Sequence, residues 1–124
     1  MKHFNEDVPI YIQVRQEIEK AIINGAIPEG EMVPSIRKVA QDYKINPQTV
    51  SNALSELVSE GIIFKKRGVG FFVKDKAKKI LRKQKAEQFR KQELHSTIKK
   101  GYMLGIKKRE FIDAIEKVYN GKGE

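Results

Sequence analysis

A run of uncharged polar side chains follows Asn46 and Pro47, and their chemical types suit hydrogen bonding to the edges of DNA bases. Gln and Asn can each form two hydrogen bonds to an adenine, and Ser or Thr can bond to bases or to phosphates. The residues recur on one side of a predicted helix: Gln48, Thr49, Ser51, Asn52, Ser55. A solvated helix face has the same composition, so the neighbouring elements must decide between the two interpretations.

The preceding predicted helix contains a cation, Arg37, and begins near a hydroxyl, Ser35. Arg37 is one turn into that helix, which in a helix-turn-helix crosses the DNA backbone, so Arg37 could reach a phosphate or a base edge. A surface salt bridge, for example to Asp42, is the alternative. Ser35 is predicted mainly to cap the helix, and its hydroxyl or backbone N–H could also contact a phosphate.

Further cations precede two glycines: Lys65, Lys66 and Arg67 come directly before Gly68-Val69-Gly70. The cations could enter a minor groove or lie on phosphates, and glycine lets the backbone approach DNA closely. The glycines could also serve only the turn, and both roles can hold together. The Gly-x-Gly pattern is not a dinucleotide-binding motif, because no helix follows at the required place.

The spacing of apolar residues predicts the elements that position these groups. Ser35 and Asn46 have the side chains of helix N-caps, Pro47 suits a first helical position, and Gly61 suits a helix end. Helices are expected over residues 9–24, 35–43 and 46–60, and strands over 62–66 and 71–73. A helix-turn-helix followed by a β-hairpin favours DNA binding over a merely solvated face.

The composition changes after residue 73. Residues 1–73 contain nine basic and nine acidic side chains, whereas residues 74–124 contain sixteen basic and seven acidic ones, which accounts for the net charge of +9. A basic helical pattern runs from about Lys76 to Leu104, Gly105 suits its end, and a last amphipathic helix follows. The cations between Lys74 and Lys91 either keep this helix solvated or attract phosphates without sequence preference.

The two helices of this tail carry more apolar surface than one chain can readily cover. A second copy of the chain would cover the remainder, so the tail is predicted to form a dimer interface. The residues expected in it are Leu94, Ile98, Tyr102, Phe111, Ile115 and Val118.

Composition argues against several function classes. The chain has no cysteine, which excludes disulfides, thiolate catalysis and Cys-based zinc sites and suits a reducing cytosol. His3 and His95 are far apart and lack metal-ligand spacing. No motif of a hydrolase, metalloprotease or P-loop protein occurs, and no apolar run approaches the roughly 20 residues of a membrane span. We therefore expect no enzymatic activity, cofactor, metal or membrane partner, and a cytoplasmic location.

Spaced sequence blocks between residues 9 and 73 resemble the winged-helix domain of the GntR family of bacterial transcription regulators. The blocks are Pro9-Ile10-Tyr11-x-Gln13, Val33-Pro34-Ser35-x-Arg37-x-Val39-Ala40, Asn46-x-x-Thr49-Val50-x-x-Ala53, Leu57-x-x-x-Gly61 and Arg67-Gly68-x-Gly70-x-Phe72-Val73. The short tail, with Leu104-Gly105-Ile106 between its helices, resembles the YtrA subfamily.

The resemblance implies DNA contacts at Arg37, Pro47, Gln48, Thr49 and Ser51, with Arg67 and Gly68 on the wing. Ser51 and Asn52 occupy positions where many family members have a basic residue, so no operator sequence can be transferred. Leu54 replaces a common Tyr, and Lys107 stands where a capping Ser or Thr is usual.

The sequence thus predicts an α+β, mostly helical fold. A winged helix-turn-helix DNA-binding domain is expected over residues 1–75 and a two-helix dimerisation tail over 76–124. The expected function is that of a homodimeric repressor that binds a palindromic operator in double-stranded DNA. The expected DNA-binding residues are Ser35, Arg37, Pro47, Gln48, Thr49, Ser51, Asn52, Lys66, Arg67 and Gly68.

Two other function classes stay open: a non-specific nucleic-acid-binding or architectural protein, and a winged-helix protein-interaction module. The tail is too short to build a separate pocket domain. Any small-molecule effector is therefore expected at the dimer interface or between the tail and the winged domain.

Overall fold

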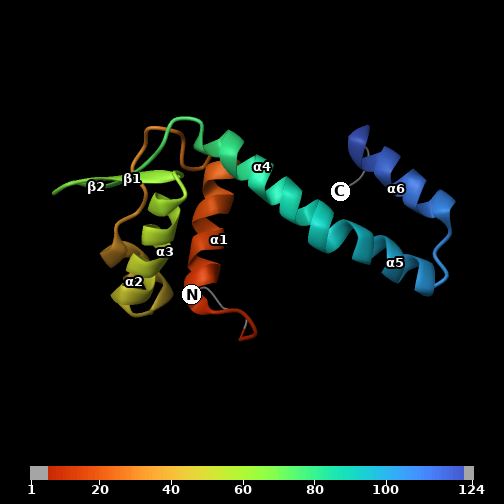
Figure 1. Cartoon of the computed structure of the whole chain (residues 1–124), viewed down its shortest axis with the longest axis horizontal. Helices are drawn as coiled ribbons and strands as arrows, with labels where there is room; N and C mark the ends of the chain where they lie inside the picture. The colour runs from red at the N-terminus through yellow and green to blue at the C-terminus, as the bar shows by residue number, and fades with distance from the viewer. Residues whose placement is uncertain (1–5, 122–124) are drawn as a thin grey trace. The chain divides into compact units, whose positions relative to one another are not determined.

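The computed structural model describes residues 6–121, which belong to two compact units, Met1–Gln84 and Lys85–Glu124 (Figure 1). The first unit contains α1 (Ile10–Ile23), α2 (Ile36–Tyr43), α3 (Pro47–Ser59), β1 (Ile63–Lys66), β2 (Gly70–Val73) and the start of α4 (Ala77–Phe89). The second contains the end of α4, then η1 (Arg90–Leu94), α5 (His95–Met103) and α6 (Lys108–Tyr119).

The two predicted N-caps are confirmed at the starts of α2 and α3. The hydroxyl oxygen of Ser35 accepts a hydrogen bond from the backbone N–H of Lys38 at 3.1 Å. The side-chain oxygen of Asn46 accepts one from Gln48 N–H at 2.8 Å, and Pro47 fills the first position of α3. These caps satisfy N–H groups that have no partner within the helix. Both helices therefore begin where the sequence predicts.

The hairpin pairs β1 with β2 in an antiparallel register, with Phe64 opposite Phe72 and Lys66 opposite Gly70. Met32 forms an isolated bridge with Phe72, and Val33 N–H donates to the carbonyl of Phe71 at 2.8 Å. The segment before α2 therefore extends the two-stranded sheet at its edge. These bonds tie the wing to the helix-turn-helix.

The core of the first unit lies where α1 packs beside α3 (Figure 1). Its apolar side chains are Val14, Ile18, Ile22, Val33, Val39, Ala40, Val50, Ala53, Leu54, Leu57, Ile62, Ile63, Val73, Ala77 and Leu81. Ala77 and Leu81 come from α4 and are completely buried. The sequence placed the domain boundary between residues 75 and 76, whereas the first turns of α4 contribute to the winged core.

A carboxylate from the loop after α1 caps the start of α4. The Glu29 oxygens accept hydrogen bonds from the backbone N–H of Lys76 at 3.0 Å and of Lys78 at 3.3 Å. The bond from Lys76 is the main cause that holds the pKa of Glu29 below its ordinary value. A carboxylate is favoured at a helix N-terminus, where the helix dipole is positive. Glu29 thus fixes the chain as it leaves the wing.

Arg15 joins α1 to α3 through carboxylates on both helices. Its Nε lies 3.2 Å from Glu19 of α1, its Nη1 lies 2.8 Å from Glu56 of α3, and its Nη2 pairs with Glu60 at the end of α3. Burial alone would lower the pKa of Arg15, but the hydrogen bonds to Glu60, Glu56 and Glu19 raise it. The cation thus holds acidic residues of α1 and α3 together on one side of the unit.

In the second unit the helical chain continues to Met103, as predicted, but residues 90–94 form a π-helical turn that apolar periodicity did not predict. Gly105 has a φ of 82°, the left-handed conformation that suits a helix end. Lys107 N–H donates to the Glu110 carboxylate at 2.8 Å, so Glu110 caps the start of α6 where a capping Ser or Thr is absent. Among residues 85–121, only Gly101 is buried.

The observed order of helices and strands confirms a mostly helical, winged helix-turn-helix fold followed by a helical C-terminal region. None of the helices between residues 6 and 121 is long and apolar enough to span a membrane. The same residues contain no group of three or more His, Cys, Asp or Glu side chains that could hold a metal ion.

Candidate nucleic-acid interface

The outer face of α3 is uncharged over its first two turns. Gln48 Nε2 donates to Asn52 Oδ1 at 3.0 Å, and both side chains are exposed. This bond orients the two amides relative to each other and leaves the Gln48 carbonyl oxygen and both side-chain N–H groups of Asn52 available to a base edge. Thr49 and Ser51 are half-buried beside them. The structure therefore brings together the predicted polar residues of α3.

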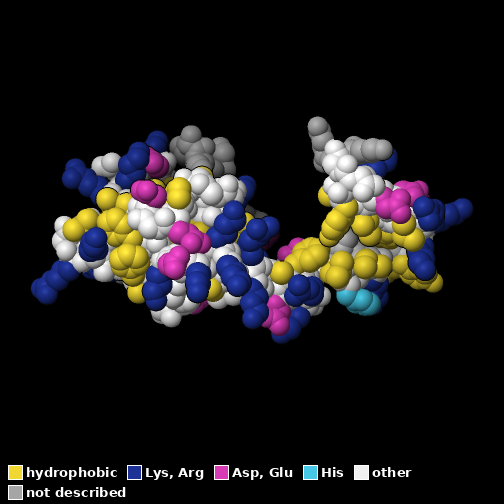
Figure 2. Space-filling view, turned by 90° about the horizontal axis from the view of Figure 1, so that it is seen from above, with side chains coloured by type: hydrophobic (Ala, Val, Ile, Leu, Met, Phe, Trp, Pro, Cys, Tyr) yellow, Lys and Arg dark blue, Asp and Glu magenta, His cyan; other side chains and the backbone are white. Residues whose placement is uncertain are grey.

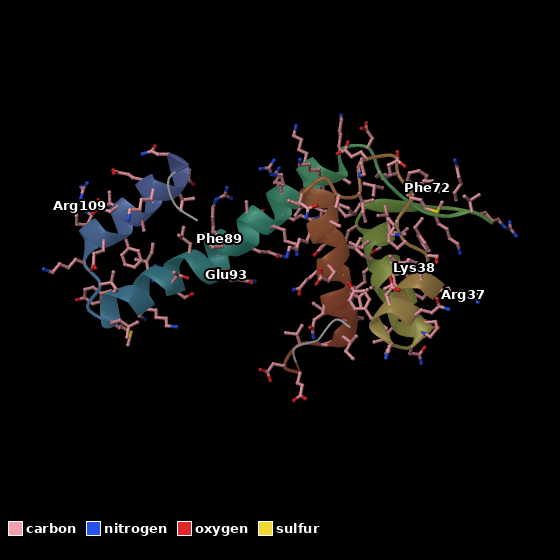
Figure 3. All side chains as sticks on the ribbon, turned by 180° about the vertical axis from the view of Figure 1, so that it is seen from behind. Arg37, Lys38, Phe72, Phe89, Glu93 and Arg109 are labelled. Atoms are coloured by element: carbon pink, nitrogen blue, oxygen red, sulfur yellow. The ribbon has the colours of Figure 1, made fainter. Side chains whose placement is uncertain are left out.

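Arg37 projects from the first turn of α2 and is exposed (Figure 3). The predicted alternative, a salt bridge to Asp42, is wrong, because Lys38 forms that ion pair at 3.2 Å. The side chain of Arg37 has no hydrogen bond or ion pair with any residue in the described range 6–121. Its guanidinium donors are thus available for a phosphate or for the acceptor edge of a guanine.

An open groove of about 470 Å³ lies where α2 meets the start of α3. It is lined by Ile36, Arg37, Ala40, Gln41, Ile45 and Pro47. Of these lining residues, sequence reasoning assigned only Arg37 and Pro47 to the interface. An apolar residue at the edge of a core gives no signal in the sequence that it also lines a surface groove.

The two lysines of the wing lie over aromatic rings. Lys66 Nζ lies 5.1 Å from the ring centroid of Phe72, and Lys65 Nζ lies 5.8 Å from that of Phe71. Arg67 and Gly68 follow at the tip, where Gly68 has a φ of 76° and Val69 N–H donates to the Lys66 carbonyl at 2.9 Å. The tip can thus present Arg67 to DNA while the rings restrict both lysines.

Sequence reasoning missed an aromatic pair on this hairpin. The rings of Phe64 and Phe72 stack with their centroids 5.8 Å apart, and Phe64 is exposed. The alternation of the strand residues could have placed Phe64 and Phe72 on one face, but only the register shows that they pair. The pair packs two side chains across the strands of the wing.

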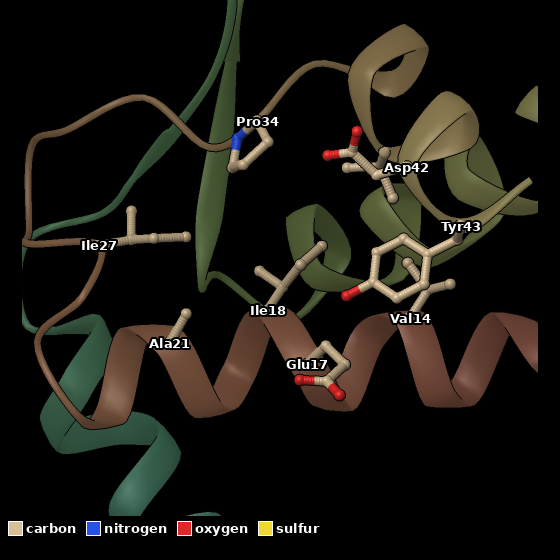
Figure 4. A pocket seen from close by; sticks show the side chains of 9 residues that line it. Val14, Glu17, Ile18, Ala21, Ile27, Pro34, Asp42 and Tyr43 are labelled. Carbon is tan, nitrogen blue, oxygen red and sulfur yellow. The ribbon is translucent and has the colours of Figure 1, made fainter. Parts of the chain in front are cut away.

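A second hollow, of about 250 Å³, separates α1 from α2 and the loop before it (Figure 4). Val14 and Ile18 of α1 lie opposite Tyr43 of α2, and carboxylates come from Glu17 and Asp42. A rim with two carboxylates repels phosphate. We therefore place this hollow outside the DNA-contacting surface.

The predicted dimer residues fall into two groups within the second unit. Phe111 is half-buried because its ring lies against Gly101 of α5. The others are exposed: Leu94, Ile98, Tyr102, Ile115 and Val118. The exposed fraction reaches 78% for Tyr102 and 62% for Val118. Hydrophobic side chains gather over α5 and α6 in Figure 2.

Both units of the chain are similar to parts of known proteins. The family described as "Bacterial regulatory proteins, gntR family" matches residues 10–73. The HTH-type transcriptional repressor YtrA of Bacillus subtilis is 32% identical over 110 residues, which is 89% of this chain and 84% of YtrA. A GntR-family transcriptional regulator from Listeria monocytogenes has a similar structure, with a TM-score of 0.76 and 30% identity over 92% of this chain and 98% of that one.

A further solved structure contains DNA. The DNA-binding domain of AraR, in complex with operator ORR3, superimposes with a TM-score of 0.53 and 30% identity. The match covers 59% of this chain and 86% of the AraR chain. That similarity is therefore confined to the winged helix-turn-helix part, whereas YtrA and the Listeria protein extend it through the tail.

Proposed function

Because the chain belongs to the GntR family of bacterial regulatory proteins, we propose that it is a homodimeric transcriptional repressor that binds a palindromic DNA operator. The observation that carries the proposal is the position of Arg37, exposed and unpaired among the described residues, beside the uncharged polar face of α3. The relatives named as repressors, and the AraR domain in complex with operator DNA, support the same function.

Operator recognition combines three elements of the first unit. The polar face of α3 enters the major groove, and Gln48 and Asn52 bond to base edges. Arg37 of α2 contacts a phosphate or a neighbouring guanine, while Ser35 lies at the start of the same helix. The wing, with Lys66, Arg67 and Gly68, lies over the adjacent backbone or minor groove.

The second unit pairs two copies of the chain. It buries no side chain of α5 or α6 completely, yet it exposes large apolar residues on both helices. Such a surface needs a partner, and a two-fold interface uses the same patch on both copies. Two recognition helices related by that two-fold axis read two half-sites of a palindrome and add their contacts. The regulator acts on DNA in the cytoplasm, and a small effector could alter the spacing of the two helices.

Selection of bound duplexes from random DNA tests the proposal, with the full chain at two salt concentrations. The expected result is one enriched palindromic motif and analytical ultracentrifugation that shows a dimer. An architectural protein would bind without enrichment and lose affinity equally on all sequences as salt rises. A protein-interaction module would retain no DNA at either salt concentration.

A further inference from the structure

We infer that the groove between α2 and the start of α3 holds the 5-methyl group of a thymine in the operator. The inference rests on the proposed function and adds a specific chemical group to it. The protein would then read an apolar feature of the DNA as well as hydrogen-bonding edges. The thymine belongs in each half-site, next to the base pair that Arg37 contacts.

The lining of the groove is apolar in its interior and polar at its edge. Ile36 and Ala40 come from α2, Ile45 comes from the turn, and Pro47 opens α3. Arg37 and Gln41 are the polar residues of the lining, and both are exposed. The groove therefore offers van der Waals contact at its centre and hydrogen-bond donors at its margin.

The thymine methyl group is the only apolar group that a standard base pair presents in the major groove. A deoxyribose is the other apolar part of DNA that could lie there, and it carries no sequence information. The thymine is favoured because the groove is continuous with the polar face of α3: Pro47 lines it, and Gln48 is the next residue. A side chain adjacent to a base-reading residue lies within reach of base edges.

The groove is preformed, so binding costs little reorganisation. Lys44 has a left-handed φ of 56° in the turn, and Ile45 N–H donates to the Ala40 carbonyl at 3.0 Å. Ala40 is buried and small, which leaves space above it, and the ring of Pro47 is exposed. Proline lacks a backbone N–H and has a fixed ring. Pro47 therefore presents only apolar surface at the mouth of the groove.

The arrangement also predicts the neighbouring base. Arg37 lines the groove on α2, and a guanidinium bonds best to the O6 and N7 acceptors of guanine. We expect a guanine beside the thymine in the selected half-site. Gln41, one helical turn after Arg37, lies on the same side of α2 and can contact the adjoining phosphate.

Deoxyuridine substitution tests the inference, because uracil lacks only the methyl group. One thymine position of the selected operator is replaced at a time, in both half-sites of the same duplex. The dissociation constant of the full-length protein is then measured for each duplex. Loss of one buried methyl contact in each half-site, and so of two per bound dimer, is expected to weaken binding roughly 15-fold. The expected result is such a loss at one thymine position adjacent to a guanine, with little change elsewhere.

The variant Pro47→Ala locates the contact. It removes the apolar ring at the groove mouth and keeps a residue suited to a first helical position. It should bind the thymine and deoxyuridine operators with similar affinity, whereas the matched control Pro28→Ala, at an exposed loop proline outside the groove, should still discriminate. Circular dichroism and melting temperature verify that both variants fold.

The outcomes separate the inference from the proposed function. No enriched operator would remove both. An enriched operator that binds equally well after each thymine replacement would overturn the methyl contact and leave the proposed function intact. Discrimination that persists unchanged in Pro47→Ala would place the methyl contact elsewhere and would also overturn it.

Discussion

The ring of Phe111 lies directly on the backbone of Gly101, so that α6 approaches α5 at a point where α5 has no side chain. A Cβ atom at position 101 would lie 2.7 Å from Cε2 of Phe111 and closer still to its Cζ. Gly101 is also the only buried residue between residues 85 and 121. The helical hairpin of the second unit is therefore organised around this contact.

The first prediction concerns this contact: Gly101→Ala should destabilise the second unit. Alanine adds about 1 kcal/mol of helix propensity, but displacement of the Phe111 ring costs about 1–3 kcal/mol. The net result should be a lower melting temperature and weaker dimerisation. The double variant Gly101→Ala with Phe111→Leu should recover part of the lost stability. The control variant Thr97→Ala, on the exposed side of α5, should leave the melting temperature unchanged. A more stable Gly101→Ala protein would contradict the packing described.

The proposed dimer makes Ile98 sensitive to charge. Ile98→Glu should yield a monomer, because a carboxylate buried between two copies lacks a partner and the two-fold axis places its counterpart nearby. Sedimentation analysis measures the oligomeric state. Thr97→Glu adds the same charge one residue away, at an exposed polar position, and should remain dimeric. An Ile98→Glu dimer would locate the interface outside α5.

Removal of a base contact should reduce specificity. Arg37→Ala and Gln48→Ala are each expected to weaken operator binding by roughly 1–3 kcal/mol without a change in helix content. Lys38→Ala is the matched control for Arg37, because it removes a neighbouring cation that is already paired with Asp42. Fluorescence titration with operator and scrambled DNA measures the effect. Equal losses on both sequences would assign Arg37 a purely electrostatic role.

The basic residues of α4 should add affinity but no specificity. Neutralising Lys78, Lys79, Arg82 and Lys83 together should weaken operator and random DNA by similar factors, because phosphate contacts carry no sequence information. The slope of log affinity against log salt concentration should become less steep. A loss confined to the operator would instead indicate a base-reading role for α4.

Glu29 should link the stability of the first unit to pH. Its pKa in the folded chain lies below the ordinary 4.5, because its carboxylate accepts the backbone N–H groups of Lys76 and Lys78. The stabilisation is therefore fully present above that value and is lost as the pH falls through the folded pKa. Glu29→Gln should lower the melting temperature at pH 7, and its difference from the parent should narrow as the pH falls below 4.5. Glu87→Gln, at an exposed site in α4, is the control. A difference that stays constant with pH would contradict the role of the charge.

Local sequence signals predicted the winged unit well. Ser35, Asn46 and Pro47 act within a few residues of their own positions, so their types alone locate the starts of α2 and α3. The family resemblance then supplied the order of the elements and the positions that are expected to face DNA. Neither signal required knowledge of distant contacts.

The features that the sequence did not reveal depend on contacts between distant residues. Ala77 and Leu81 are two apolar residues inside a basic segment, so their spacing gives little indication of burial. Only the packed core shows that they belong to the winged unit. From the sequence alone, Gly101 would be expected only to weaken its helix. The structure shows that the ring of Phe111, ten residues later, packs against it.

The pairing of one guanidinium with three carboxylates has a consequence for how this protein can evolve. If Arg15 became uncharged, Glu19, Glu56 and Glu60 would be left as neighbouring like charges. A lineage that loses Arg15 is therefore expected to lose acidity at these positions as well, and a lineage that keeps it can exchange one acid at a time. Among relatives, residues at positions 15, 56 and 60 should consequently change together, although 41 and 45 residues separate the first position from the others.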